Sequence, residues 1–386
     1  MIYLDWNATA PVHPAVAEHL ARVFREAVTA PGNPSSVHQG GRIARARLDA
    51  ARQRLARVVG CEPKEICFTA TGSEAVALAV RGAFEARKDR ARSRVVISAI
   101  EHPALLGTAK QLEAEGATVV RVAPGPDGRV NADELIAALT PDTAIASVMW
   151  ANNETGTLQP VREIARACRE RGILFHTDAV QAAGKVPVTL REVDADLISI
   201  SGHKFGGPTG IAMLVIRRGI DVAPLVPGHQ EWGRRGGTQN LPYIEALALA
   251  LELANDALER ELPRLTALRD RFEREVCSRI DGVVVNGGAA PRVSNTSNLR
   301  FTGADGEALL IALDLAGICV SAGAACASGS LSPSHVLTAM GLTPKQAHES
   351  LRFSLGRDST DADVDAAVAA LVEAVPRARE AAAANA

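Results

Sequence analysis

Residues 199 to 210 read Ser-Ile-Ser-Gly-His-Lys-Phe-Gly-Gly-Pro-Thr-Gly and follow an apolar run, so that a lysine lies at the end of an expected strand. Lys204 is there a candidate Schiff-base lysine, because a partly desolvated site with cationic neighbours favours the neutral amine that attacks a carbonyl. A glycine-rich loop with one lysine is a weak signal alone, since most lysines are solvated surface charges. The surrounding sequence decides between the two interpretations.

The preceding strand ends on an acid. Residues 172 to 181, Gly-Ile-Leu-Phe-His-Thr-Asp-Ala-Val-Gln, predict a buried strand that ends near Asp178, with Gln181 shortly after it. Ligands of open α/β sheets bind at the carboxyl ends of the strands, where a carboxylate can keep a pyridinium nitrogen protonated. Asp178 alone would be more typical of a helix N-cap, but the lysine after the next strand favours the functional interpretation.

A third segment predicts a phosphate site. Residues 68 to 75, Phe-Thr-Ala-Thr-Gly-Ser-Glu-Ala, form an expected turn at the start of a helix. The N–H groups of Gly72 and Ser73, the hydroxyls of Thr71 and Ser73 and the positive end of the helix dipole would cradle a phosphate. Thr71 and Glu74 also have the spacing of a capping box, and the two interpretations are compatible.

Two further polar clusters follow predicted strands. Glu101-His102-Pro103 comes after the strand at 94 to 98, and Ala-Asn-Asn-Glu-Thr-Gly at 151 to 156 follows the strand that begins at Thr143. His102 could stack on a flat cofactor and carry protons, whereas a lone histidine is more often simply packed or exposed. Because the clusters share one expected sheet edge, we predict that they form one site.

The periodicity of the chain indicates the fold class. Strand-like runs alternate with helical stretches and lie at 94 to 98, 117 to 122, 143 to 149, 173 to 177, 196 to 200 and 211 to 216. Such alternation predicts an α/β protein with a mainly parallel sheet covered by helices. The stretch from 241 to 279 predicts two helices, interrupted at Pro263, that cross into a smaller C-terminal α/β domain.

Composition narrows the class of protein. With 386 residues, 47% hydrophobic and 22% charged, the chain can bury a sizeable core and is expected to form two unequal domains. A net charge of −2 argues against direct nucleic-acid binding. The chain has no apolar run of about 18 residues and no signal-peptide pattern, so we expect a cytoplasmic protein without a membrane partner. Its six cysteines show no zinc-binding spacing, which predicts free thiols and no metal site.

Together these segments resemble the pyridoxal-phosphate-dependent cysteine desulfurases of the NifS/IscS type, in the fold-type-I aminotransferase superfamily. The resemblance is nearly end to end, and it also includes Tyr-Leu-Asp-Trp-Asn-Ala-Thr-Ala-Pro at 3 to 11 and Gly-Asn-Pro-Ser-Ser-Val-His at 32 to 38. It implies a large cofactor-binding domain, residues 14–255, with a mainly parallel seven-stranded sheet. Residues 1–13 and 256–386 would form the smaller α/β domain.

The resemblance also implies roles for single residues. Lys204 would form the Schiff base with pyridoxal 5′-phosphate, Asp178 would pair with the pyridine nitrogen, and His102 would stack on the ring. The ring hydroxyl and the substrate side would be contacted by Gln181 and Asn153. The phosphate would be held by Gly72, Ser73, Ser201 and His203. In Arg-Arg-Gly-Gly-Thr-Gln-Asn at 234 to 240, Thr238 matches a residue that reaches the phosphate of the neighbouring subunit, which implies a homodimer.

The most discriminating segment is Ser-Ala-Gly-Ala-Ala-Cys-Ala-Ser-Gly-Ser-Leu-Ser-Pro-Ser-His-Val-Leu, residues 321 to 337. Small residues around Cys326 suit a thiol that must travel from substrate to acceptor, and a buried structural cysteine fits such a loop badly. The family has its nucleophilic cysteine here, and the long loop resembles the NifS/IscS branch rather than the short-loop SufS branch. Downstream, Arg352 matches the arginine that binds the substrate carboxylate, a task for which its planar fork is suited.

Four departures from the family pattern stand out. After the phosphate turn this chain has Ala-Val-Ala-Leu-Ala at 75 to 79, where the family usually has an asparagine. Gly-Ala-Ala-Cys at 323 to 326 replaces Gly-Ser-Ala-Cys, and Arg-Gly-Gly-Thr at 235 to 238 replaces Arg-Ser-Gly-Thr. Neither change removes a catalytic group. Trp6 replaces a small polar residue, which bears on substrate tuning or partner choice more than on the reaction class.

The implied activity is the conversion of L-cysteine to L-alanine. The sulfur would be held as a persulfide on Cys326 and then passed to an acceptor protein, such as an iron–sulfur scaffold or a sulfur carrier. A selenocysteine lyase or a small-amino-acid aminotransferase of the same fold is the alternative. A Rossmann dehydrogenase is disfavoured, because no G-x-G-x-x-G follows the first strands.

Overall fold

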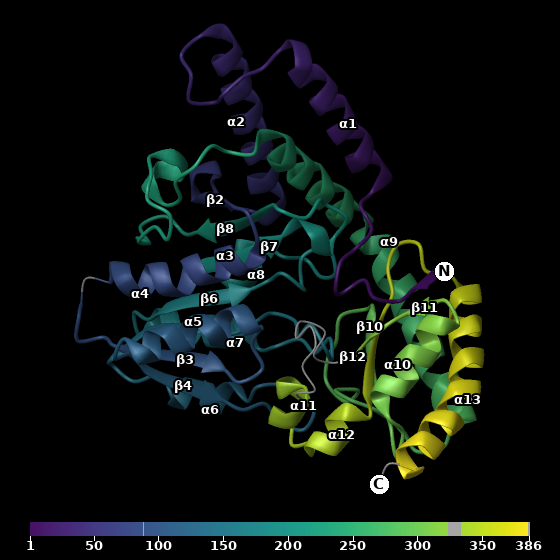
Figure 1. The fold of residues 1–386 in the computed structure, drawn as a ribbon. Coiled ribbons are helices and arrows are strands. Elements are labelled where there is room, and N and C mark those ends of the chain that lie inside the picture. Colours follow the sequence, from purple (N-terminus) through teal and green to yellow (C-terminus); the bar gives the residue numbers. More distant parts are fainter. Residues whose placement is uncertain (88, 323–332, 385–386) are drawn as a thin grey trace.

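The computed structural model describes residues 1–87, 89–322 and 333–384. Its larger part is built on a seven-stranded sheet (Figure 1). In spatial order the strands are β2 (Ile66–Thr69), β8 (Ala212–Ile216), β7 (Leu197–Ser201), β6 (Leu174–Asp178), β5 (Thr143–Ser147), β3 (Arg94–Ser98) and β4 (Thr118–Val122). Only β8 runs antiparallel to its neighbours in this sheet, which confirms the mainly parallel seven-stranded expectation. The short β2 was not among the predicted strand-like runs.

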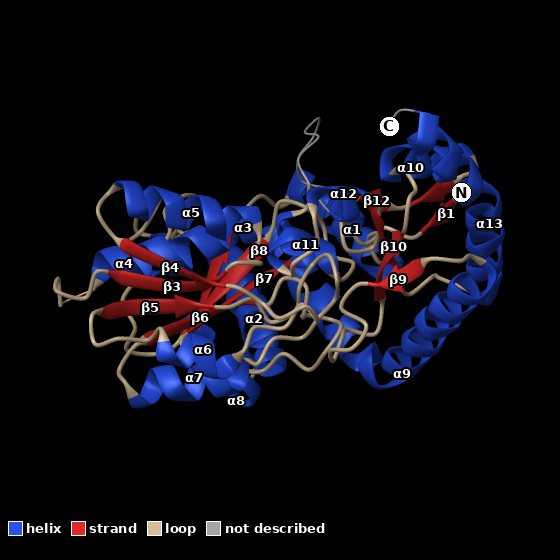
Figure 2. Cartoon of the chain, turned by 90° about the horizontal axis from the view of Figure 1, so that it is seen from below, coloured by secondary structure: helices blue, strands red, loops and turns tan. Residues whose placement is uncertain are grey.

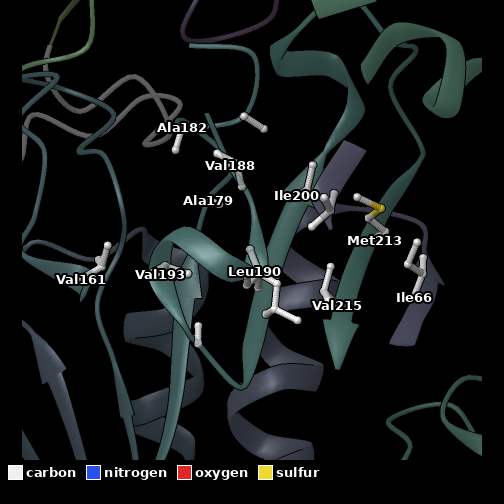
Figure 3. Close-up of a cluster of buried hydrophobic side chains, with 14 of the residues drawn as sticks. Ile66, Val161, Ala179, Ala182, Val188, Leu190, Val193, Ile200, Met213 and Val215 are labelled. Atoms are coloured by element: carbon white, nitrogen blue, oxygen red, sulfur yellow. The ribbon is translucent and has the colours of Figure 1, made fainter. Parts of the chain in front are cut away.

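Helices cover both faces of this sheet (Figure 2). Alternate residues of a strand point to opposite faces, so Val95 and Ile97 pack on one side while Val96 packs on the other. The first face is covered by α3 (Gly72–Ala77), the π-helical turn Leu78–Gly82, α4 (Ala83–Ala86) and α5 (Pro103–Ala114). The second is covered by α2 (Gln39–Val59), α6 (Ala132–Ala137), α7 (Val161–Glu170) and α8 (Leu190–Val193). Figure 3 shows part of this second core, where Ile200, Met213 and Val215 of the sheet lie near Leu190.

The smaller part has its own sheet and core. Its strands lie in the order β12 (Ser321–Ala322), β13 (Ser350–Ser354), β10 (Thr296–Phe301) and β9 (Val283–Val285). Phe272, Phe301 and Phe353 are at the centre of its core. The N-terminal strand β1 (Ile2–Tyr3) pairs with β11 (Ile318–Cys319) of this part. Its helices are α10 (Gly306–Leu315), α11 (His335–Ala339), α12 (Pro344–His348) and α13 (Asp361–Ala384).

One helix connects the two parts. The prediction of two helices divided at Pro263 is wrong, because α9 is continuous from Leu241 to Arg279. Its first half packs on α1 (Pro14–Thr29) and α2, and its second half enters the smaller core through residues such as Leu268 and Phe272. Packing on both sides of the proline outweighs the single backbone hydrogen bond that a proline removes. The proposed domain boundary at residue 255 stays a prediction, and it falls within this helix.

No helix in the described residues is both long and apolar enough to cross a membrane.

Candidate active site

A cavity of about 520 Å³ lies where the strands β2, β3, β5, β6 and β7 end. This volume is within the range of about 300–1,000 Å³ that is typical of small-molecule sites. Its lining includes the predicted site residues Gly72, Ser73, His102, Asn153, Asp178, Gln181, Ser201, His203, Lys204 and Arg352. Thr238 is exposed and is not among the described residues that line the cavity, while Cys326 lies outside the part of the chain that the structure describes.

Lys204 ends the short turn Gly202–Lys204 that follows β7. Its Nζ donates hydrogen bonds to the carbonyl oxygens of Asn7 and Ala8, each at 2.8 Å. Both acceptors are neutral and come from the N-terminal segment, so the amine is held in the cavity by the arm of the chain that begins in the smaller part. The sequence predicted the lysine but not these partners.

Asp178 is the last residue of β6 and is buried. Its Oδ1 accepts a hydrogen bond from the Val180 N–H at 2.9 Å. Burial raises the pKa of the carboxyl to about 6, and the Val180 N–H and Lys204 oppose that rise. A buried carboxylate in this position is stabilised by a cation placed against it. A protonated pyridine nitrogen would provide that charge.

His102 is the N-cap of α5, where its Nδ1 accepts a hydrogen bond from the Ala104 N–H at 3.1 Å. A neutral imidazole that accepts at Nδ1 carries its proton on Nε2. Burial, with smaller contributions from the charges of Lys204 and His335, lowers the pKa of His102 to about 4. The ring is therefore neutral near pH 7, with Nε2–H as its donor.

The predicted phosphate cradle lies where α3 begins. Gly72 and Ser73 occupy the first helical turn, whose leading N–H groups have no acceptor within the helix. A Cβ added at Gly72 would lie 3.2 Å from the Cβ of Ser201, so the two backbones approach closely. Thr71 Oγ1 accepts from the Glu74 N–H at 3.0 Å, so capping and phosphate binding are compatible here.

His203 is another residue that was predicted to hold the phosphate, and it lines the same cavity. Its Nδ1 lies 2.8 Å from Thr9 Oγ1, and burial lowers its pKa to about 4, with a smaller contribution from Lys204. The helix terminus, the hydroxyls and the buried Asp178 carboxylate are the donor and acceptor set that pyridoxal phosphate requires. The residues present therefore fit the cofactor.

Arg352 lies on β13 and closes the cavity from the smaller part. Its Nη1 donates to the Asn153 carbonyl at 3.0 Å, and its Nη2 donates to Asp5 Oδ1 at 2.7 Å. Its Nε is buried and has no hydrogen-bond partner among the described residues. The ion pair with Asp5 was not predicted, although Asp5 belongs to the N-terminal segment that carries the family resemblance.

Two more side chains, Asn7 and Lys185, were missed by the sequence analysis. Asn7 is buried, and its backbone carbonyl accepts from Gln181 Nε2 at 2.9 Å as well as from Lys204. Lys185 is also buried, and its Nζ donates to Gln181 Oε1 at 2.5 Å and to Asn7 Oδ1 at 2.7 Å. Glu154 is buried in the Asn-Asn-Glu cluster. The sequence signal that could have identified Asn7 is its position as a polar residue in the N-terminal segment that carries the family resemblance.

The described residues on either side of Cys326 meet this same site. Ser321 of β12 is paired with Arg352 in the smaller sheet. On the other side, Ser334 Oγ donates to Glu154 Oε2 at 2.5 Å, and His335 Nε2 lies 2.9 Å from the Glu101 carbonyl oxygen. The described residues that flank Cys326 on both sides therefore contact residues of the site.

Two of the departures from the family pattern have a steric explanation. A Cβ at Gly236 would lie 2.2 Å from the Pro227 carbonyl oxygen, so this backbone has no room for a serine. A Cβ at Gly356 would lie 1.8 Å from the Trp6 ring, so the indole occupies the space that the glycine leaves open. Trp6 is therefore a packing residue that fixes the N-terminal segment beside the site.

Comparisons with known proteins agree with this architecture. The family model described as Aminotransferase class-V matches residues 2–367. The chain is 43% identical to a cysteine desulfurase of Trichormus azollae over 98% of its own length and 94% of the relative's. It is 44% identical to an IscS-like cysteine desulfurase of Mycobacterium tuberculosis, covering 99% and 98% of the two chains. A solved NifS-like protein superposes with a TM-score of 0.89 at 33% identity, over 97% of this chain and 99% of that one. The chain therefore belongs to the class-V aminotransferases and, within them, to the pyridoxal-phosphate-dependent cysteine desulfurases.

Proposed function

We propose that this chain converts L-cysteine to L-alanine, holds the sulfur as a persulfide on Cys326 and then passes it to an acceptor protein. One observation carries the assignment of residues: Lys204, Asp178, His102 and Arg352, from separate elements, line a single cavity. The anchoring of Ser321 and Ser334 beside that cavity supports Cys326 as the sulfur-carrying residue.

Pyridoxal phosphate, when bound, supplies an electron sink for the pair left on Cα after its proton is removed. The Lys204 amine would hold the cofactor as a Schiff base and, once displaced by substrate, would accept the Cα proton. Asp178 would keep the ring nitrogen protonated. Backbone N–H groups at Gly72 and Ser73, with the side chains of Ser73, Ser201 and His203, would hold the phosphate.

Arg352 and Asn153 would orient the substrate. The guanidinium would bind the L-cysteine carboxylate, directing the substrate sulfur toward the side of the cavity where Ser321 and Ser334 lie. The Cys326 thiolate would attack that sulfur, so that an S–S bond forms while the substrate Cβ–S bond breaks. The bonding electrons stay with the carbon fragment, which is protonated to alanine. His102, neutral and protonated at Nε2, would carry protons between the thiols.

A homodimer completes the proposal. Thr238 would reach the cofactor phosphate of the neighbouring subunit. Large apolar side chains are exposed both in the loop of Thr238, at Trp232, and on α1, at Phe24 and Val28. Exposed apolar groups of this kind are typical of surfaces that become buried against another chain.

The acceptor would be an iron–sulfur scaffold or a sulfur carrier, and a cytoplasmic location stays a prediction. A selenocysteine lyase or an aminotransferase is the alternative that the first experiment must separate from a desulfurase.

The decisive test is a single turnover with L-cysteine and no reductant, with alanine quantified and the protein mapped by mass spectrometry. We expect one alanine per active subunit and one added sulfur on Cys326. Cys326→Ser should bind cofactor and transfer no sulfur, whereas Cys277→Ser, which alters an exposed free thiol, should behave as wild type. Lys204→Ala should lose the absorption band of the Lys204–cofactor linkage. Sulfide release by Cys326→Ser would indicate a lyase, and a keto acid product would indicate an aminotransferase.

A further inference from the structure

Lys185 is a buried cation held by neutral groups. Its side chain is almost fully enclosed, with only 8% of the residue exposed. The two hydrogen bonds of its Nζ go to the amide oxygens of Asn7 and Gln181, at 2.7 and 2.5 Å. Burying an ammonium group against neutral partners is unfavourable, so its position beside the cavity requires an explanation.

The first consequence concerns the orientation of Gln181. A lysine can only donate hydrogen bonds, so it holds the amide oxygens of Asn7 and Gln181 toward itself. The Gln181 NH2 group is then directed elsewhere, and one of its hydrogens is donated to the Asn7 carbonyl at 2.9 Å. Because Gln181 lines the cavity, its second N–H is the group that the cavity can use. Lys185 therefore makes Gln181 a donor toward the cavity.

The second consequence concerns Lys204. The Asn7 carbonyl that accepts from Gln181 also accepts from Lys204 Nζ at 2.8 Å. The Asn7 side chain is fixed on its other side as well, since its Nδ2 donates to Thr296 Oγ1 at 2.9 Å. Lys185 and Lys204 are thus joined through the two ends of one buried asparagine. Movement of the Asn7 side chain would also move the acceptor of the Lys204 amine.

Charge reinforces this connection. Burial lowers the pKa of Lys185 well below its usual value, and the positive charges of Lys204 and Arg352 lower it further. Two carboxylates of the site have other partners: Asp5 pairs with Arg352, and Asp178 accepts a hydrogen bond from the Val180 N–H. Lys185 also lines a second cavity, of about 310 Å³, whose lining includes Lys204.

We infer that Lys185 is a positioning residue of the reaction. It fixes the Gln181 amide so that an N–H donor faces the ring hydroxyl of the cofactor, and it fixes Asn7 so that the Lys204 amine is held toward the same ring. This role rests on the proposed function, because it presupposes the cofactor in the first cavity. It adds a residue that touches neither the cofactor nor the substrate.

The test compares Lys185→Met with the wild-type holoenzyme. Two quantities are measured: the cofactor dissociation constant, by fluorescence titration, and the pH midpoint of the absorption band of the Lys204–cofactor linkage. We expect cofactor binding about tenfold weaker, or ~1.4 kcal/mol. We also expect the midpoint to rise by about one pH unit, because a hydrogen-bond donor to the ionised ring hydroxyl disfavours an added proton and that donor is lost when Gln181 is no longer oriented.

Controls separate positioning from folding. Val186→Ala removes packing at the adjacent residue without changing a polar contact of Lys185, and it should leave the midpoint unchanged. Lys185→Gln restores an amide donor without the charge, so it should recover part of the cofactor affinity, and it also serves if the methionine variant does not fold. In a double-mutant cycle, Lys185→Met and Gln181→Leu should be clearly less than additive if Lys185 acts through Gln181.

Two results would overturn the inference. Wild-type affinity and midpoint in Lys185→Met would show that Lys185 has no positioning role while leaving the cofactor site intact. Absence of the absorption band in the wild-type protein reconstituted with cofactor would remove the proposed site itself, and Lys185's role with it.

Discussion

Asp5 should weaken the binding of L-cysteine, and its neutralisation should therefore tighten it. The Asp5 carboxylate lies 2.7 Å from Nη2 of Arg352, in a pair whose side chains are 17% and 3% exposed. The substrate carboxylate must bind the same guanidinium, which has donors left for it on Nε, Nη1 and Nη2. Substrate binding would then bring two carboxylates onto one cation.

The magnitude follows from their separation. Two like charges on opposite edges of one guanidinium are roughly 6 Å apart, and they repel by about 0.7 kcal/mol at the dielectric constant of water and about 2.8 kcal/mol at an effective value of 20. A central value of ~1.4 kcal/mol corresponds to about tenfold in affinity. Asp5→Asn keeps the shape and an acceptor oxygen for Arg352, so we expect the dissociation constant of L-cysteine to fall about tenfold.

The assay is a spectral titration of holoenzyme with L-cysteine in the Cys326→Ser background, where no sulfur leaves the substrate. A dissociation constant is preferred to KM, because KM also contains the rates of later steps. Asp358→Asn is the matched control, since Asp358 pairs with Arg357 at an exposed position of the same part of the chain. Weaker binding in Asp5→Asn would refute the reasoning, because it would mean that Asp5 orients Arg352 for the substrate rather than competing with it.

Two further predictions concern stability. Gly356→Ala should lower the free energy of unfolding, measured in urea, by about 1–3 kcal/mol, because its Cβ would overlap the Trp6 ring. The control Gly107→Ala, whose Cβ would meet nothing within 4 Å, should not lower it. Equal effects of the two substitutions would contradict this account. Burial raises the pKa of Glu101 to about 8, so the folded protein binds the Glu101 proton more tightly than the unfolded chain does. This contribution to the free energy of unfolding is fully present below about pH 4.5 and is lost as the pH rises through 8. Wild type should therefore lose stability relative to Glu101→Gln between pH 5 and pH 8, and parallel urea-unfolding profiles would disprove it.

The sequence predicted the strands and site residues that follow from local patterns of apolar and polar residues. Apolar runs bounded by polar clusters located six of the seven strands of the large sheet, and the rule that ligands bind at carboxyl ends of strands brought His102, Asp178 and Lys204 to one edge. The prediction failed at Pro263, because a proline interrupts a helix only when nothing else holds the two halves in line. In α9 each half packs on a different core.

The sequence could not predict contacts between distant segments. Asn7 and Lys185 are 178 positions apart, and neither belongs to a local pattern that indicates burial. Asp5 and Arg352 are 347 positions apart and look like surface charges in their own segments. These contacts follow from the return of the N-terminal arm across the site, where β1 pairs with β11 and the arm crosses to the large sheet. Only the folded chain brings them together.

The N-terminal arm supports both halves of the site, the half that would bind the substrate carboxylate and the half that would bind the cofactor. Asp5 opens a turn in which the Ala8 N–H donates to the Asp5 carbonyl at 3.0 Å, and Asp5 and Asn7 both reach the site from this turn, one toward Arg352 and the other toward Lys185. Trp6, between them, packs against Gly356 on the other side and fixes the arm. Asp5→Asn should change substrate affinity without moving the absorption band, and Lys185→Met should move the band with less effect on the substrate. Gly356→Ala displaces the arm itself, so it alone should change both, which distinguishes a shared support from two independent sets of contacts.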